Sequence, residues 1–177
     1  MKITFSIKNL DDIEGIKIIT PSTHREDRGE IWTSYSSIAL DKLLPKNLRF
    51  KHDKFSRSHF NVIRGIHGDK KTWKLISCVH GNIFQVVVDM RTASRTFLKW
   101  HSFELSQEDN RMILLPPGVG NAFYVKSSHA VYHYKLAYEG EYFDANKQFT
   151  VAWNDPRLKI NWPTNQPFLS KRDKGIK

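Results

Sequence analysis

The sequence predicts an all-β fold, with a sandwich, a jelly roll and a barrel as the candidate architectures. Short runs of β-branched and aromatic residues recur along the chain, and turn-forming residues separate most of them, which is typical of strands joined by turns. Helical signals are few, and one short helix is expected over 37–45, ending at Pro45. We find no repeat and no linker, so one domain is expected over residues 1–177.

The expected strands are short and closely spaced, and an apolar or β-branched run marks each of them. They cover residues 15–20, 30–36, 72–81, 82–91, 96–105, 111–115 and 129–138. Gly81-Asn82 is a tight-turn signal between two of these strands. The last strand alternates well, and one of its faces carries Ala130, Tyr132, Tyr134, Leu136 and Tyr138.

The chain carries a formal net charge of +10. Such a charge attracts polyanions, and both nucleic acid and a phosphorylated small molecule fit that description. The basic residues do not form one block, however, and no zinc-finger, RNP-type or helix-turn-helix pattern is present. We therefore do not expect a nucleic-acid partner.

Cys78 is the only cysteine, so no intramolecular disulfide is possible, and its apolar strand predicts a buried side chain. The N-terminal residues carry charges throughout and lack the apolar core of a signal peptide. No window approaches the roughly 18 apolar residues of a membrane span. The sequence predicts a cytoplasmic protein without a membrane partner.

Acid–base chemistry is the catalytic class that single residues favour. His67 lies in a glycine-flanked segment that permits close approach of a ligand, and imidazole suits proton transfer near neutral pH. A lysine such as Lys74 could stabilise charge, and Tyr134 could act as an acid. Each also has an ordinary structural explanation, namely a surface histidine, a solvated lysine and an aromatic packing face, and the residues alone favour that explanation. Lys70 and Lys71 are expected to be solvated loop lysines.

Metal and cofactor chemistry have little support in the sequence. No His-X-His pair occurs, and the two histidines of residues 59–67 are far apart for a strand site. No glycine-rich phosphate loop and no Gly-X-Ser-X-Gly nucleophile motif is present. We expect no metal and no cofactor.

An ordered series of motifs resembles one enzyme family. Along the chain these are FKHDKFSRSHFNVIRGIH, KLISCVHGNIFQVVVDMRTASRTFLKW, ILLPPGVGNAF, YHYK, AWNDPRLKINWP and LSKRD. They resemble, in order and rough spacing from about Thr20 to Asp173, the blocks of the dTDP-4-dehydrorhamnose 3,5-epimerases. The resemblance implies a cupin-like jelly roll, a homodimer and an isomerase that needs neither metal nor redox cofactor. The residues of several blocks are most similar to those of a branch that acts on GDP-4-keto-heptoses in the synthesis of capsular polysaccharide.

The resemblance implies a role for each matching residue. His67 matches the family's base, and Asp173 matches the carboxylate that orients it. Lys74 matches the lysine near the developing C4 oxyanion, and Tyr134 matches the acid on the opposite face of the sugar. Arg64 matches an arginine that binds the diphosphate.

A second diphosphate-binding arginine is matched by Arg28, which in the family reaches the site from the partner subunit. Two departures concern a titrating pair of the family, because Asn121 stands in place of its histidine and Gln85 in place of its aspartate. Amides form hydrogen bonds but do not titrate. We therefore expect Asn121 and Gln85 to contact the substrate without moving a proton, Asn121 at the C4 oxygen.

The positions that contact the nucleotide base in the family also differ. His52, Lys54 and Thr33 replace the family's residues there, which favours a base other than thymine and agrees with GDP. Tyr138 and Tyr142 both lie near the family's second tyrosine, and we take Tyr138 as the candidate substrate contact. Three alternatives stay open: a C3-only epimerase, an enzyme for dTDP-4-keto-6-deoxyglucose, and a non-catalytic jelly roll that binds sugar nucleotides.

Overall fold

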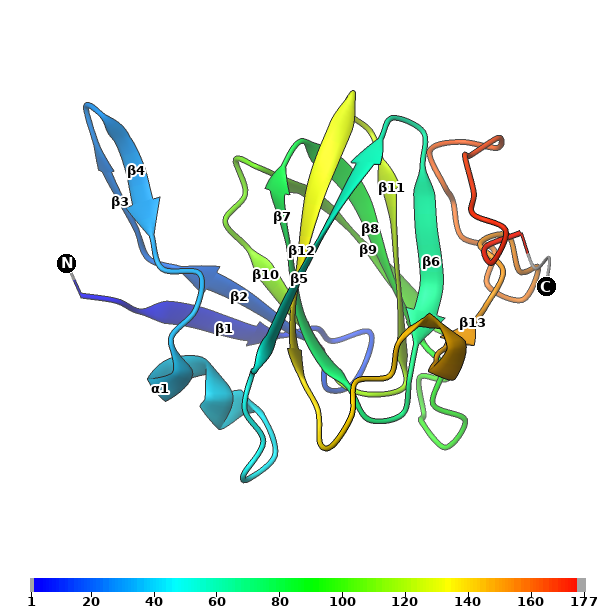
Figure 1. Ribbon diagram of the computed structural model, residues 1–177, viewed down its shortest axis with the longest axis horizontal. Coiled ribbons are helices and arrows are strands. Elements are labelled where there is room, and N and C mark those ends of the chain that lie inside the picture. The colour runs from blue at the N-terminus through cyan, green and yellow to red at the C-terminus, as the bar shows by residue number, and fades with distance from the viewer. Residues whose placement is uncertain (1, 175–177) are drawn as a thin grey trace.

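Two antiparallel sheets pack face to face in the computed structural model, which describes residues 2–174 (Figure 1). The strands are β1 (Phe5–Asn9), β2 (Lys17–Pro21), β3 (Thr23–Glu26), β4 (Gly29–Trp32), β5 (His52–His59), β6 (Ile63–Gly68), β7 (Trp73–His80), β8 (Asn82–Asp89), β9 (Trp100–Ser106), β10 (Met112–Leu115), β11 (Val119–Val125), β12 (His129–Ala137) and β13 (Phe149–Thr150). The helical pieces are α1 (Ser37–Leu40), η1 (Asp41–Leu43) and η2 (Ala145–Lys147). The predicted all-β jelly roll with a few short helices is confirmed.

The two sheets form one sandwich around a shared core. One sheet has six strands in the order β1-β2-β10-β7-β12-β5, and the other has five in the order β13-β6-β11-β8-β9. A buried cluster fills the space between them, with Ile76 and Tyr132 from the first sheet and Val87 and Phe123 from the second. The alternating burial of β12 follows from this contact, because its inward face carries the apolar and aromatic residues.

The outer faces of the sheets are covered as well. The segment around α1 packs Leu40 and Phe50 against the outside of the six-stranded sheet. The C-terminal segment packs Leu158 and Trp162 against the outside of the five-stranded sheet. This double covering explains why the consecutive residues Val86, Val87 and Val88 of β8 are all buried although they alternate between its two faces.

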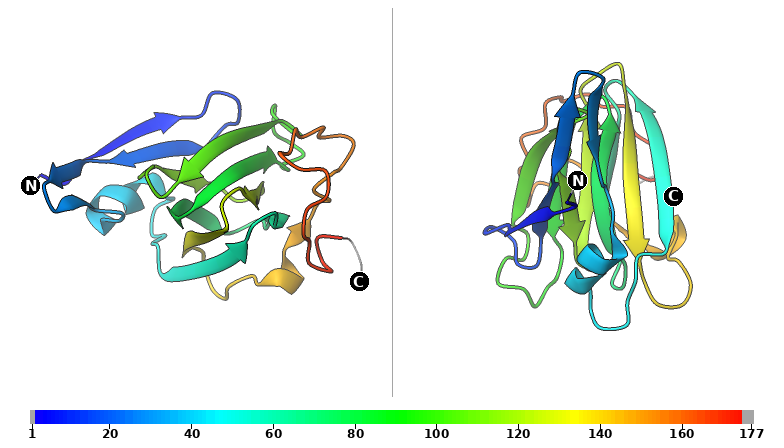
Figure 2. Two further views of the ribbon diagram at one scale, coloured as in Figure 1. Left: turned by 90° about the horizontal axis from the view of Figure 1, so that it is seen from above. Right: turned by 90° about the vertical axis from the view of Figure 1, so that its left-hand side faces the viewer.

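The strands β3 and β4 form a separate two-stranded hairpin that projects away from the sandwich. Figure 2 shows this hairpin at one end of the molecule and the C-terminal segment at the other. The expected strand over 30–36 ends at Trp32 in the structure, because the chain bends there toward α1. The expected ranges do not include β1, β3, β5, β6, β11 or β13.

The burial that the sequence predicts for Cys78 can be checked directly. Cys78 is buried with 4% of its surface exposed, as expected for a small apolar side chain. Among the residues described, none of the helices is long and apolar enough to cross a membrane.

Candidate active site

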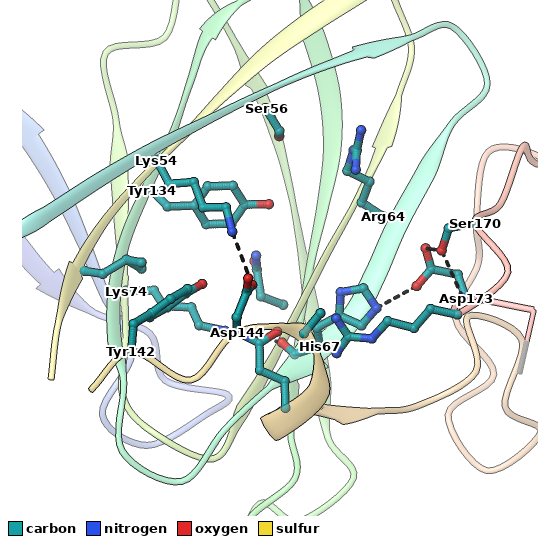
Figure 3. A pocket seen from close by; sticks show the side chains of 15 residues that line it. Lys54, Ser56, Arg64, His67, Lys74, Tyr134, Tyr142, Asp144, Ser170 and Asp173 are labelled. Carbon is teal, nitrogen blue, oxygen red and sulfur yellow. Dashed lines mark hydrogen bonds and ion pairs between the residues drawn. The ribbon is translucent and has the colours of Figure 1, made fainter. Parts of the chain in front are cut away.

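A cavity of about 270 Å³ opens between the two sheets, beyond the end of the shared core (Figure 3). Its walls come from β5, β7 and β12 of one sheet, from β6 and β11 of the other, and from two segments that close its rim. The lining residues are Lys54, Ser56, Arg64, His67, Lys74, Asn121, Tyr134, Leu136, Tyr142, Asp144, Ala145, Gln148, Ser170, Arg172 and Asp173. Seven of the twelve predicted site residues are therefore brought together: His67, Tyr134, Asp173, Lys74, Arg64, Asn121 and Lys54.

A carboxylate orients His67, and a second hydrogen bond orients that carboxylate. His67 Nε2 lies 2.6 Å from Asp173 Oδ1, and Ser170 Oγ donates to Asp173 Oδ2 at 2.7 Å. Burial alone would raise the pKa of Asp173, but hydrogen bonds from His67 and Ser170 lower it below its usual value. The ionised carboxylate requires a proton on His67 Nε2, so Nδ1 carries the free lone pair that a base needs.

Arg64 and His67 both reach the cavity because β6 contains one extra residue. His67 pairs with Asn121 and Arg64 with Phe123, so three steps on β6 face two steps on β11. This β-bulge brings onto one side two residues that a regular strand would point to opposite sides. Gly65 lies inside the bulge with φ 124°, and a Cβ there would meet the Asn121 carbonyl oxygen at 2.6 Å.

Tyr134 faces the cavity from the opposite sheet. It lies on β12 between Lys54 of β5 and Ile76 of β7. Burial raises the pKa of Tyr134 to about 12. Its hydroxyl therefore keeps its proton at neutral pH and can serve as an acid. Figure 3 shows Tyr134 and His67 on different walls of the cavity.

Lys74 is a buried cation at the inner end, with 6% of its surface exposed. Burial lowers the pKa of Lys74 to about 8, Asp69 opposes this effect and Arg172 adds to it. Its Nζ lies 3.5 Å from the carbonyl oxygen of His67. A buried cation beside the base is suited to stabilise negative charge that develops on a substrate oxygen.

Asn121 lines the cavity, whereas Gln85 does not. Gln85 is fully buried behind Asn121, and its Nε2 donates to Asn121 Oδ1 at 2.7 Å. The predicted substrate contact of Gln85 is therefore corrected, because the side chain of Asn121 stands between it and the cavity. The sequence places two amides, Gln85 and Asn121, where the family has a titrating pair, and the two are hydrogen-bonded to each other.

The mouth of the cavity is more loosely held. Lys54 Nζ and Asp144 Oδ1 form an ion pair at 3.5 Å, with 46% and 69% of their side chains exposed. His52 Nδ1 lies 3.2 Å from the Tyr138 hydroxyl, and its ring meets Tyr142 edge to face. Tyr142 lines the cavity and Tyr138 packs behind His52, so the choice of Tyr138 over Tyr142 is corrected.

Arg28 and Thr33 lie away from this cavity. Arg28 occupies the turn of the β3–β4 hairpin, where it pairs with Glu26 and has 85% of its side chain exposed. Thr33 directly follows β4. The hairpin projects from the sandwich, so neither residue contributes to the cavity of its own chain. The contact of Arg28 with substrate stays a prediction about a second subunit, and the contact of Thr33 with the base stays a prediction.

Sequence reasoning missed several residues of the rim. Ser170 and Arg172 belong to the recognised LSKRD block, so their positions beside Asp173 carried a signal that was not used. Asp144 and Gln148 carried no sequence signal, because they lie in the irregular segment between β12 and β13. Lys71, expected to be a solvated loop residue, holds that segment instead: its Nζ binds the carbonyl oxygens of Glu139 and Glu141 and lies 3.7 Å from the Phe143 ring centre.

No group of three or more His, Cys, Asp and Glu side chains that could hold a metal ion occurs within residues 2–174. The charged groups that line the cavity include two pairs, His67 with Asp173 and Lys54 with Asp144, and the further cations Arg64, Lys74 and Arg172. The arrangement offers a base, an acid and cations in one enclosed space.

Comparison with known proteins gives consistent matches. The family model described as dTDP-4-dehydrorhamnose 3,5-epimerase matches residues 11–177. The chain is 34% identical to dTDP-4-dehydrorhamnose 3,5-epimerase of Escherichia coli, over 93% of this chain and 90% of that protein. It is also 34% identical to dTDP-4-dehydrorhamnose 3-epimerase of Streptomyces niveus, over 91% of this chain and 78% of the relative.

A solved structure supports the same grouping. The dTDP-6-deoxy-D-glucose-3,5-epimerase of Legionella pneumophila, crystallised with dTDP-4-keto-L-rhamnose, superposes with a TM-score of 0.87 at 35% sequence identity. The match covers 97% of this chain and 91% of the other. Fold and sequence thus agree along nearly the whole chain.

Proposed function

Because the chain belongs to the dTDP-4-dehydrorhamnose 3,5-epimerase family and is an isomerase of sugar nucleotides, we propose that it inverts C3 and C5 of a nucleotide-linked 4-keto sugar. The observation that carries this proposal is the placement of His67 and Tyr134 on opposite sheets of one cavity. A base and an acid on opposite sides of a sugar ring are what inversion of a carbon centre requires.

The reaction begins with proton removal. The C4 ketone acidifies the neighbouring C–H bonds, and His67 Nδ1 takes a proton from carbon, leaving an enolate. Asp173 stabilises the imidazolium that forms and keeps the ring in its working orientation. Lys74 and Asn121 donate to the C4 oxygen, where negative charge develops.

The reaction ends on the other face of the ring. Tyr134 gives its hydroxyl proton to the same carbon, and the C–H bond is restored with opposite configuration. The imidazolium of His67 and the phenolate of Tyr134 then exchange protons with solvent. Positioned acid–base groups contribute roughly 10²–10⁴-fold each to such steps.

The diphosphate is expected at the basic part of the rim. Arg64 lies beside the cavity and is oriented by a 2.7 Å hydrogen bond from its Nε to Ser58 Oγ. Arg172 provides a further guanidinium on the same cavity. In a homodimer, Arg28 would reach the partner's site, and its position on a projecting hairpin supports that role.

The nucleotide is proposed to be dTDP and the sugar a 4-keto-6-deoxyglucose, because the relatives above are enzymes of dTDP-linked sugars. A second candidate is a GDP-linked 4-keto-heptose. It is favoured by His52, Lys54 and Thr33, which depart from the family at its base-contacting positions. The cluster of His52 with Tyr138 and Tyr142 gives the mouth an aromatic surface suited to a base.

The test is solvent exchange in D2O with dTDP-, GDP- and CDP-linked 4-keto sugars. Deuterium at C3 and C5 of one substrate is the expected result. Label at C3 alone would make the protein a C3-only epimerase, as the name of the Streptomyces niveus relative describes for that protein.

Two variants separate catalysis from binding. His67→Asn should lower exchange by about 10³-fold and Tyr134→Phe should lower inversion by about 10³-fold, while the substrate's dissociation constant changes little in both. A Phe168→Leu variant, at an exposed position outside the cavity, serves as the control. Full exchange in His67→Asn, or full inversion in Tyr134→Phe, would contradict the role assigned to that residue. Absence of exchange with every substrate would favour a non-catalytic sugar-nucleotide binder.

A further inference from the structure

A buried polar network supports the inner wall of the cavity. Gln85 on β8 and Tyr132 on β12 are both fully buried, and Asn121 on β11 has 6% of its surface exposed. The three side chains come from both sheets and meet between them. Of the three, Asn121 alone lines the cavity.

The orientation of Gln85 follows from a backbone group. Gln85 Nε2 lies 2.9 Å from the carbonyl oxygen of Val86, which can only accept a hydrogen bond. The nitrogen end of Gln85 is therefore fixed on that side. Its oxygen end accepts from the Tyr132 hydroxyl at 2.7 Å, which fits the same assignment.

Gln85 in turn fixes Asn121. The second hydrogen of Gln85 Nε2 points to Asn121, so the atom it meets at 2.7 Å has to be Oδ1. The Tyr132 hydroxyl lies 3.1 Å from the same oxygen. A reversed Asn121 would place two NH2 groups against each other, which costs a buried hydrogen bond.

The NH2 group of Asn121 is consequently the part that faces the cavity. It makes no hydrogen bond to any residue in the range 2–174. A chain of fixed donors runs from the Val86 carbonyl through Gln85 and Asn121 to the open space beside His67, whose strand position pairs with Asn121.

We infer that Gln85 and Tyr132 are positioning residues, which hold the NH2 group of Asn121 toward the C4 oxygen of the substrate. This inference rests on the proposed function. Gln85 touches no substrate and acts only through Asn121. A donor that is oriented before the substrate arrives needs no rearrangement when the enolate forms, and an amide keeps its donor at every working pH.

A double-mutant cycle tests this inference. Its exchange assay uses the substrate of the panel on which the wild-type protein is active. Gln85→Met removes the anchoring donor and should lower kcat about tenfold, with KM changed less than about threefold. Asn121→Leu should lower kcat about 10²-fold. Because Gln85 acts through Asn121, Gln85→Met should have no further effect in the Asn121→Leu background.

Gln107→Met is the matched control, because the Gln107 amide accepts a hydrogen bond from the Gly81 backbone far from the cavity. Its kcat should equal that of the wild type. If Gln85→Met does not fold by circular dichroism, Tyr132→Phe takes its place in the same cycle, with an expected loss of about threefold.

An unchanged kcat in the anchoring variant, or the same fold loss with and without Asn121, would overturn the inference. Failure of the proposed function is seen separately, because the wild type would then exchange no substrate of the panel.

Discussion

The two ends of the cavity are built differently. At the inner end, His67 and Asn121 on paired strands make hydrogen bonds of 2.6–2.7 Å to Asp173 and Gln85, which are themselves hydrogen-bonded. At the mouth, Lys54 and Asp144 form a solvent-exposed pair at 3.5 Å. The inner end is built mainly on paired strands, whereas the irregular segment between β12 and β13 supplies much of the mouth.

This difference separates two tasks. Proton transfer needs groups held in one geometry, which paired strands and buried hydrogen bonds provide. Substrate selection needs surfaces that can change among relatives, which loops and exposed ion pairs permit. Changes at the inner end should therefore act on kcat, and changes at the mouth on KM.

The largest effect is expected from two matched carboxylate variants. Asp173→Asn removes the charge that orients His67 and should lower kcat by about 10³-fold. Asp144→Asn removes a carboxylate of the mouth and should change kcat less than about threefold, because exposed ion pairs contribute little. Steady-state exchange kinetics measure both, and equal losses would abolish the distinction between the two ends.

The next effect concerns stability of the bulge in β6. Gly65→Ala combines backbone strain at φ 124° with contacts to β11, whereas Gly29→Ala has φ 127° and open space around it. Denaturant unfolding should show Gly65→Ala to be less stable than Gly29→Ala by about 2 kcal/mol. Equal free energies of unfolding would mean that β11 yields to the extra methyl group.

The pH dependence of kcat probes the inner end further. Lys74, with its pKa lowered to about 8, is cationic below that pH and loses its charge above it. The exchange rate should therefore fall about tenfold per pH unit above about pH 8. Lys74→Arg should retain its charge and remove this fall. A wild-type rate that stays flat up to pH 9.5 would exclude Lys74 as the titrating group.

The smallest effect is expected at the mouth. Lys71→Met removes the contacts that hold the 139–143 segment and should raise KM about fivefold at unchanged kcat. Lys70→Met, at the neighbouring exposed lysine, is the control and should leave both constants unchanged. A fall in kcat without a change in KM would assign this segment to the chemistry rather than to binding.

The sequence predicted regular features well and irregular ones poorly. The alternation of β12 placed Tyr132, Tyr134 and Leu136 on one inward face, because period-2 patterns record burial directly. The motif series brought His67, Lys74 and Asp173 into one site although Asp173 lies 106 residues after His67. Both kinds of inference use residue type and order alone.

The remaining features depend on contacts that residue order does not encode. The bulge in β6 is visible only once β11 is paired with it. The burial of Gln85 behind Asn121 depends on how β8 and β11 align in the sheet. Lys71 was misjudged because its partners are backbone carbonyls nearly seventy residues later, which have no sequence signature.

The bulge also sets the separation of Arg64 and His67 along β6. A strand advances about 3.3 Å per residue, so Arg64 and His67 begin less than about 10 Å apart on the same backbone. In the proposed binding mode, with Arg64 on the diphosphate and His67 at a ring carbon, a substrate has to match the separation of these two points. A change of nucleobase leaves that separation untouched, whereas a shortened phosphate link alters it. One strand can thus serve different nucleotides while refusing sugar monophosphates.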